Sequence, residues 1–190
     1  MKARALAIAL LCLAVPAIAQ TRVDLTAAIS KDFSGVPSAD QAVSALAADS
    51  PFLGLDWDVV IHHIGLGGIY AVDFHQDAPS TWWVDWAGQG IYLSYHLLEP
   101  RAFIDPFADI GLGCAGRVYL GPADTGEQRL ALTVYPFASL GAALDLNGLR
   151  LGAKLSYAFS RNAIPATDIP EYPIGRFIVT AFAGVSIGSR

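Results

Sequence analysis

Apolar and polar residues alternate with a period of two over most of the chain. The pattern is clearest near the C-terminus, where apolar positions from Leu149 to Phe159 alternate with polar or small positions from Arg150 to Ser160. Such alternation predicts a β-strand with one apolar and one polar face. The segment is as long as a tilted strand that crosses a bilayer, which needs roughly 9–11 residues.

Seven further segments alternate in the same way, so the sequence predicts eight antiparallel strands. The hairpin before Leu149 is the best defined, because Asn147-Gly148 is a residue pair that a type I′ turn favours. The run Gly88-Gln89-Gly90 shifts the phase of its strand and predicts a β-bulge there. The predicted strands cover approximately residues 23–29, 53–61, 66–75, 82–97, 104–119, 130–146, 149–159 and 175–187.

The predicted connections alternate between short and long. They cover approximately residues 31–51, 62–64, 76–80, 98–102, 121–128, 147–148 and 161–173. Up-and-down barrels of the outer membrane have short periplasmic turns and longer external loops, and this order puts both chain ends on the periplasmic side. An apolar stretch after Ser38 predicts a short amphipathic helix in the first loop. The predicted fold is therefore an all-β, eight-stranded antiparallel up-and-down transmembrane β-barrel.

Composition favours a membrane protein without spanning helices. The 190 residues are 54% hydrophobic and 15% charged, with a mean hydropathy of +0.44, whereas soluble domains have roughly 25% charged residues. Between Gln20 and Arg190 no uncharged apolar run reaches the length of about 18 residues that suggests a spanning helix. Because hydrocarbon offers no partners to backbone polar groups, a closed barrel is the remaining structure that can span it.

Residues 1–19 have the pattern of a cleaved secretory signal peptide. A basic start and an apolar stretch precede Ala17-Ile18-Ala19, which has the A-x-A form of a cleavage site. A single barrel domain is then expected over residues 20–190. Cleavage removes two of the 12 Lys and Arg residues and none of the 17 Asp and Glu residues. The mature chain is therefore acidic and lacks the basic surface that binding of nucleic acid requires.

Charged residues fall on one face of the predicted strands. A Lys or Arg on the lipid face would cost about 2–4 kcal/mol near the midplane, so the charged face is assigned to the barrel interior. Side chains can fill the interior of an eight-stranded barrel, and buried charges need partners. We therefore expect Asp105 and Asp109 to pair with bases of this interior network, and a lined pore or ligand slot is the alternative. The network contains the acids Asp24, Asp56, Asp58, Asp73, Asp85, Asp105 and Asp109 and the bases Arg117, Arg150, Lys154 and Arg176.

Aromatic residues gather near the loop ends of the predicted strands. Outer-membrane barrels carry girdles of aromatic residues at both membrane interfaces, so we interpret this group as a girdle, with ordinary core positions as the alternative. The predicted girdle consists of Phe74, Trp82, Trp86, Tyr157, Phe159 and Phe177.

Candidate chemistry is sparse. Ser94 and His96 lie on one strand face, and Asp85 lies elsewhere on that strand, so a lipid-modifying hydrolase is one hypothesis. No nucleophile elbow surrounds the pair, and a structural role in the interior is the favoured interpretation. His62-His63 is a poor metal chelate because adjacent strand residues point to opposite faces. Cys114 is the only cysteine left after cleavage, which excludes an internal disulfide. No cofactor or metal is expected.

The signal peptide, the eight alternating segments and the rhythm of the loops together resemble the small eight-stranded outer-membrane proteins of the OmpW/OmpX-like group. The stretches STWWVDWAGQGIYLSYHLL and FIDPFADIGLGCAGRVYL also resemble a set of spirochaete outer-membrane barrels, over residues 52–187. The resemblance implies an integral outer-membrane protein that contacts outer-membrane lipid and is inserted by the barrel-assembly machinery. The chain departs from the group at its end, since Arg190 stands where that machinery usually reads an aromatic residue.

Four hypotheses for the function follow from the sequence. The first is a non-enzymatic outer-membrane barrel that forms a narrow channel or passage for small or hydrophobic solutes. The second is a surface-exposed adhesin that binds a host or envelope ligand through loops 31–51 and 161–173. The third is the lipid-modifying enzyme. The fourth is a secreted or periplasmic barrel that binds a lipid inside, with apolar residues facing inward and charges outward.

Overall fold

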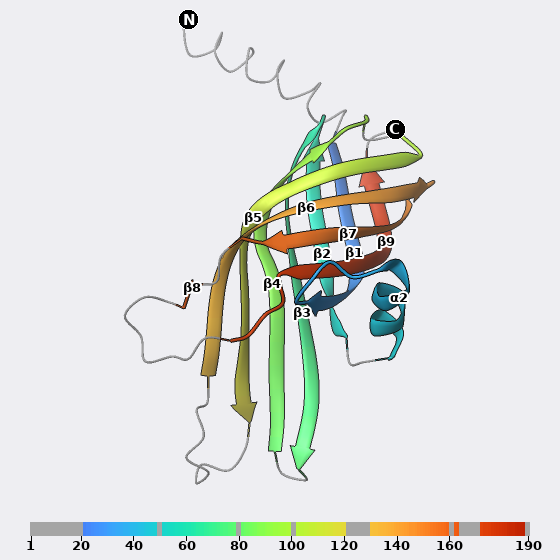
Figure 1. Cartoon of the computed structure of the whole chain (residues 1–190). Helices are drawn as coiled ribbons and strands as arrows, with labels where there is room; N and C mark the ends of the chain where they lie inside the picture. The colour runs from blue at the N-terminus through green and yellow to red at the C-terminus, as the bar shows by residue number, and fades with distance from the viewer. Residues whose placement is uncertain are drawn as a thin grey trace, which may run out of the picture.

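The computed structural model describes residues 21–48, 51–78, 81–99, 102–120, 130–159, 162–163 and 172–188. The predicted signal peptide lies outside the described residues, as do most of the predicted connections 121–128 and 161–173. The described residues form eight long strands, one two-residue strand and one helix (Figure 1). Their bounds are β1 Thr21–Phe33, α2 Ala39–Ala48, β2 Phe52–Ile61, β3 Ile64–Ala78, β4 Thr81–His96, β5 Ile104–Leu120, β6 Leu130–Leu146, β7 Leu149–Ala158, β8 Asn162–Ala163 and β9 Phe177–Gly188.

The eight long strands close into an antiparallel barrel. Each long strand pairs with its neighbours in the chain, and β1 pairs with both β2 and β9, which joins the first strand to the last. The short β8 adds to β6. Over the length that all eight strands share, closure pairs the backbone groups of each strand on both sides, which is what a hydrocarbon environment requires. The predicted eight-stranded antiparallel barrel is confirmed.

Local turn chemistry also follows the sequence. Asn147 and Gly148, between β6 and β7, have φ values of 58° and 96°, as the central positions of a type I′ turn require. The predicted bulge is present, because the register between β4 and β5 shifts between Gly88 and Ile91. The predicted helix in the first loop is α2. Within the described ranges, no helix has the length and apolar character needed to cross a membrane.

Four neighbouring strands are longer than the rest of the barrel. Strands β3, β4, β5 and β6 have 15, 16, 17 and 17 residues, whereas β2 and β7 have 10 each. The predicted connection 76–80 is wrong, because Gln76 pairs with Trp82 and Ala78 with Thr81, which carries β3 to Ala78. The ends of β3–β6 reach beyond the other strands at the lower edge of Figure 1. We call this part, residues 73–78, 81–85, 115–120 and 130–135, the extension.

The two faces of the barrel have opposite character. Along β1, buried and exposed residues alternate from Arg22 to Ser30, and the buried ones are mostly polar or charged. Large apolar residues point outward, and Leu25, Ile110 and Leu140 are 52%, 63% and 73% exposed. This distribution excludes the hypothesis of a lipid-binding barrel with an apolar interior. It is the distribution of a barrel that stands in hydrocarbon.

Aromatic side chains fill the interior beside glycines on neighbouring strands. Tyr135 of β6 is fully buried, and its ring occupies the position that a Cβ atom on Gly113 of β5 would need. A side chain at position 113 would displace this ring. Tyr135 and Phe137 belong to one buried aromatic cluster, while Phe107 and Phe182 belong to a second.

Candidate functional site

Two arginines and two aspartates form a closed ring of ion pairs inside the barrel. Arg22 of β1 pairs through Nε with Asp24 Oδ2 at 3.0 Å and through Nη2 with Asp105 Oδ2 of β5 at 2.7 Å. Arg150 of β7 binds the same two carboxylates, at 3.1 and 2.7 Å. All four residues are at most 3% exposed. We call them the ion ring, which links three strands across the interior.

His96 of β4 extends the ion ring toward β2. Its Nδ1 lies 2.9 Å from both carboxylate oxygens of Asp105, and its Nε2 lies 3.2 Å from Asp58 Oδ2. The hydroxyl of Ser94 donates to Asp58 Oδ2 at 2.9 Å and lies 3.1 Å from His96 Nε2. Ser94, His96 and Asp105 thus have the distances of a serine–histidine–aspartate triad. Asp85, which the sequence analysis considered as the acid partner of Ser94 and His96, lies in the extension and binds Arg117.

A second charged group lies next to Tyr92 of β4. The Tyr92 hydroxyl donates to Asp56 Oδ1 at 2.7 Å, and Lys154 Nζ lies 4.4 Å from the centre of the tyrosine ring. Lys154 Nζ also pairs with Asp56 at 3.3 Å and with Asp109 at 3.5 Å. The ammonium group is therefore held by two carboxylates and an aromatic face, a favourable setting for a buried cation.

The interior leaves little free space. A cavity of about 20 Å³ lies among Asp24, Asp58, His96 and Arg150, which is room for about one water molecule. Ser94 is 3% exposed and His96 is 1% exposed. A lipid ester therefore has neither room beside the Ser94 hydroxyl nor a path to it through this part of the barrel.

A third polar group lies on the inner face of the extension. Arg117 of β5 makes two hydrogen bonds of 2.6 Å to the carboxylate of Asp85 on β4. Its guanidinium lies 5.1 Å from the Trp83 ring centre and 5.8 Å from that of Tyr172. Tyr172 lies in the segment before β9, and its hydroxyl donates a hydrogen bond to Asp85 at 3.1 Å. The Thr133 hydroxyl donates to the backbone oxygen of Tyr172 and accepts from its backbone N–H. Burial and the Asp85 carboxylate raise the pKa of Tyr172, which keeps this hydroxyl a donor.

The structure separates the predicted network into these three groups. Asp105 pairs with Arg150, as expected, and also with Arg22. Asp109 pairs with Lys154. Asp73 is only half-buried and lies opposite Asp85 in the extension. Arg176 does not belong to the interior: it lies in the bend before β9, where the strand alternation has not begun, and it is exposed.

Several residues of these groups were missed by the sequence prediction, Arg22 and Tyr172 among them. The predicted interior network omits Arg22, because the first strand was predicted to start at Val23. Arg22 nevertheless continues the two-residue spacing of Asp24 and Thr26. Tyr172 falls in a predicted loop, and no periodic signal marks its inward position.

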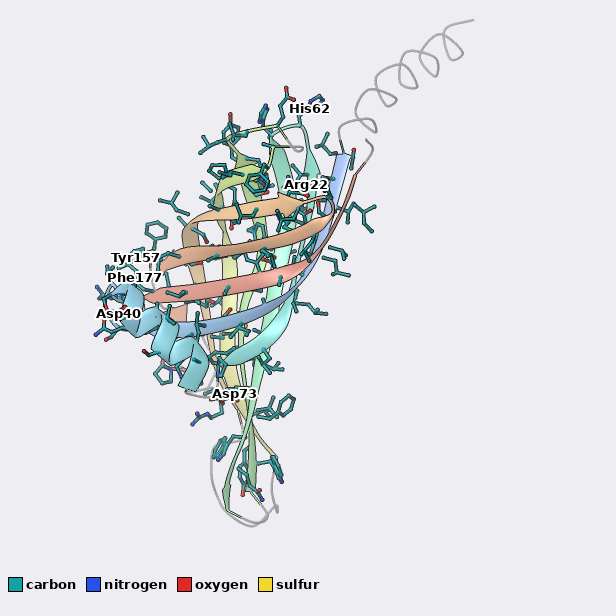
Figure 2. All side chains as sticks on the ribbon, turned by 90° about the vertical axis from the view of Figure 1, so that its right-hand side faces the viewer. Arg22, Asp40, His62, Asp73, Tyr157 and Phe177 are labelled. Carbon is teal, nitrogen blue, oxygen red and sulfur yellow. The ribbon has the colours of Figure 1, made fainter. Side chains whose placement is uncertain are left out.

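The predicted girdle residues lie on or near the outer surface, in two sets. One cluster consists of Tyr157, Phe159 and Phe177. The centre of the Tyr157 ring lies 5.1 Å from the ring centre of Phe159 and 5.1 Å from that of Phe177. Figure 2 shows Tyr157 and Phe177 together beside α2, which carries Asp40, and far from the turn at His62. Phe74 and Trp82 are 62% and 46% exposed in the extension. Trp86 is half-buried on β4.

The two histidines of the pair lie in different surroundings. His62 is exposed at the turn, and His63 Nδ1 lies 2.8 Å from the backbone oxygen of His96. Among the residues that the structure describes, no three His, Cys, Asp or Glu side chains are grouped in a way that would hold a metal ion.

Comparison with known proteins supports the fold. No protein-family model and no curated protein sequence matches the chain. The N-terminal β-barrel domain of Pseudomonas aeruginosa OprF matches with a TM-score of 0.56 and 10% identity, over 88% of this chain and 98% of that one. The outer membrane protein OprG from Pseudomonas aeruginosa matches at 0.52 and 12%, over 88% and 95%. Neisserial surface protein A matches at 0.51 and 15%, over 89% and 97%.

These neighbours have the fold of eight-stranded outer-membrane β-barrels, and this chain shares it. At identities of 10–15% the likeness extends to the fold alone. The resemblance to spirochaete barrels stays a prediction.

Proposed function

We propose that the chain is an integral outer-membrane barrel that is closed to solutes, has no enzymatic activity and acts at its external end as a surface interaction protein. The observation that carries the proposal is the filled interior. Arg22, Arg150 and Asp105 lie across the barrel at exposures of at most 3%, and the cavity beside them is about 20 Å³. A solute could pass only if this ion ring opened.

Membrane insertion is supported by the outward apolar face and by the barrel neighbours. The orientation is supported by the connections, since the short turns at His62 and at Asn147 lie at one end and the loop with α2 lies at the other. Short turns face the periplasm in barrels of this kind. The segment between β1 and β2 would then face the cell exterior, where the exposed Val36 and Val43 offer apolar contacts to a partner. It starts after Phe33, because β1 is longer than predicted.

Planar-bilayer recording tests the closed interior. The chain, purified from membranes and reconstituted, is expected to give no single-channel steps, while a general porin in the same membrane does. Steady conductance steps from the purified chain would reject the closed barrel and restore the hypothesis of a narrow channel.

Cysteine labelling tests the orientation. In a Cys114→Ala background, Ser38→Cys places a thiol in the loop before α2 and Leu98→Cys places one in the turn after β4. A membrane-impermeant maleimide is expected to label Ser38→Cys on intact cells and Leu98→Cys only after the outer membrane is opened. The reverse pattern would invert the barrel and remove the external site.

The interaction itself is tested by replacing residues 36–48 with a Gly/Ser linker of equal length. Cells that display this variant are expected to lose adherence to host cells or envelope material that bind the unaltered chain. A matched change, Leu98→Ser in the opposite turn, should leave adherence intact. Equal adherence of the linker variant would remove this loop as the binding surface.

A further inference from the structure

The outer face of the extension is mostly apolar, with the exposed Gln76 opposite Trp82 as a polar exception. On β6, nine outward positions from Leu130 to Leu146 are uncharged. On β2, across the barrel, the outward positions from Leu53 to Ile61 number five. At a rise of about 3.3 Å per residue, the apolar face measures about 50 Å along β6 and about 26 Å along β2.

The hydrocarbon thickness of the membrane has to match the apolar face at β6, the apolar face at β2, or both. With strands tilted by about 40°, the apolar face is about 40 Å high at β6 and about 20 Å high at β2, against a usual apolar band of about 25 Å. The short side therefore fits an ordinary band, and the long side exceeds it.

The aromatic residues mark two different heights. Tyr157 and Phe177 lie at the outer ends of the short strands β7 and β9, whereas Phe74 and Trp82 lie at the outer ends of β3 and β4. Aromatic side chains concentrate at the level of the lipid headgroups. If both sets lie at that level, the membrane surface rises from the β7–β9 side to the β3–β6 side.

We infer that acyl chains of the outer leaflet cover the outer face of the extension as far as Trp82, so that the hydrocarbon around this barrel is thicker on the β3–β6 side. The inference rests on the proposed membrane location. Continuity supports lipid as the occupant: the apolar positions run without a charge from the belt into the extension, through Val134 and Leu132 to Leu130 on β6. Bilayers thicken locally around proteins whose apolar surface is too tall.

Tryptophan quenching by brominated acyl chains tests this coverage. Three full-length variants each keep one tryptophan, Trp57, Trp82 or Trp83, with phenylalanine at the other three positions. Each is reconstituted into phosphatidylcholine vesicles that carry bromine near the carbonyl end of the acyl chains, bromine near their middle, or no bromine. Heat-modifiable migration on gels checks that each variant has folded.

Trp82 and Trp83 are a matched pair, because they are adjacent in β4 and point to opposite faces. Trp83 packs on Tyr119 with ring centres 4.8 Å apart on the inner face. We expect bromine near the carbonyl end to quench Trp82 as strongly as bromine near the middle quenches Trp57, which points outward from the centre of β2. Trp83 should keep its fluorescence in all three kinds of vesicle.

The other outcomes are distinguishable. If Trp57 is quenched and neither bromine position quenches Trp82, the extension projects into water and the inference is wrong, while the membrane location stands. If neither is quenched, the membrane location itself fails. If Trp82 escapes quenching and oxidation joins two chains through the outward Cys114 of β5, a second copy covers this face instead of lipid, which also overturns the inference.

Discussion

Replacing Asp105 by asparagine tests whether the ion ring holds the barrel together. Asp105 is 0% exposed and accepts hydrogen bonds from Arg22 and Arg150 at 2.7 Å and from His96 at 2.9 Å. Asparagine has almost the same shape but carries no charge. The change therefore leaves two guanidinium groups buried with Asp24 as their remaining carboxylate in the ring.

The expected loss of stability is large. Removing one partner of a buried ion pair costs about 3–5 kcal/mol, because the other charge stays buried without compensation. Two arginines share Asp105, and asparagine retains one oxygen acceptor for them. These effects oppose each other, so we expect a decrease of about 3–5 kcal/mol in the free energy of unfolding rather than twice that amount.

Urea unfolding in lipid vesicles, followed by tryptophan fluorescence and by migration on gels, measures this change. Asp40→Asn on the exposed face of α2 is the control and should alter the free energy of unfolding by less than about 0.5 kcal/mol. A loss below about 1 kcal/mol for Asp105→Asn would mean that the ring contributes no more than surface ion pairs do, and the ring would not be what holds the barrel together.

Three further predictions follow from single contacts. Gly113→Ala should destabilise the barrel by about 1–3 kcal/mol in the same unfolding assay, because its Cβ atom would press on the Tyr135 ring; an unchanged midpoint would contradict this packing. Tyr172→Phe should cost about 1 kcal/mol through loss of the bond to Asp85, whereas Tyr172→Ala, which also removes the ring beside Arg117, should cost more. Ser94→Ala should leave the lipid A profile of expressing cells unchanged in mass spectra, and a profile that reverts to that of cells without the chain would revive the enzyme hypothesis.

The sequence predicts which face of each strand is buried much better than it predicts which residues meet. A period of two leaves only two faces, and a single charge on the lipid face is costly enough to decide between them. Asp56, Asp58, Asp85, Asp105 and Asp109 accordingly are all buried. Partners depend on the stagger of strands around the closed barrel, so the contact between Asp105 and Arg22, 83 residues apart, has no local signal.

The extension was not predicted for a related physical reason. Alternation looks the same in a strand that pairs within the barrel and in one that continues past it, because both need one apolar face. The end of such a strand is set by pairing with its neighbour, as Gln76 with Trp82 shows. The predicted girdle therefore groups Phe74 with Phe177, although they lie at the ends of strands of different length.

The Ser94–His96 pair shows why triad distances alone do not imply catalysis. A serine hydroxyl has one proton to donate, and the 2.9 Å contact directs that of Ser94 to Asp58 Oδ2. Both nitrogens of His96 face carboxylates, Asp105 on one side and Asp58 on the other. Because the Ser94 proton is directed to Asp58 and Nε2 of His96 faces the same carboxylate, the ring is not placed to take the serine proton, as a general base must. The same close contacts that would assemble a hydrolase in an open site here serve to satisfy buried charges, which is the structural role that the strand pattern favoured.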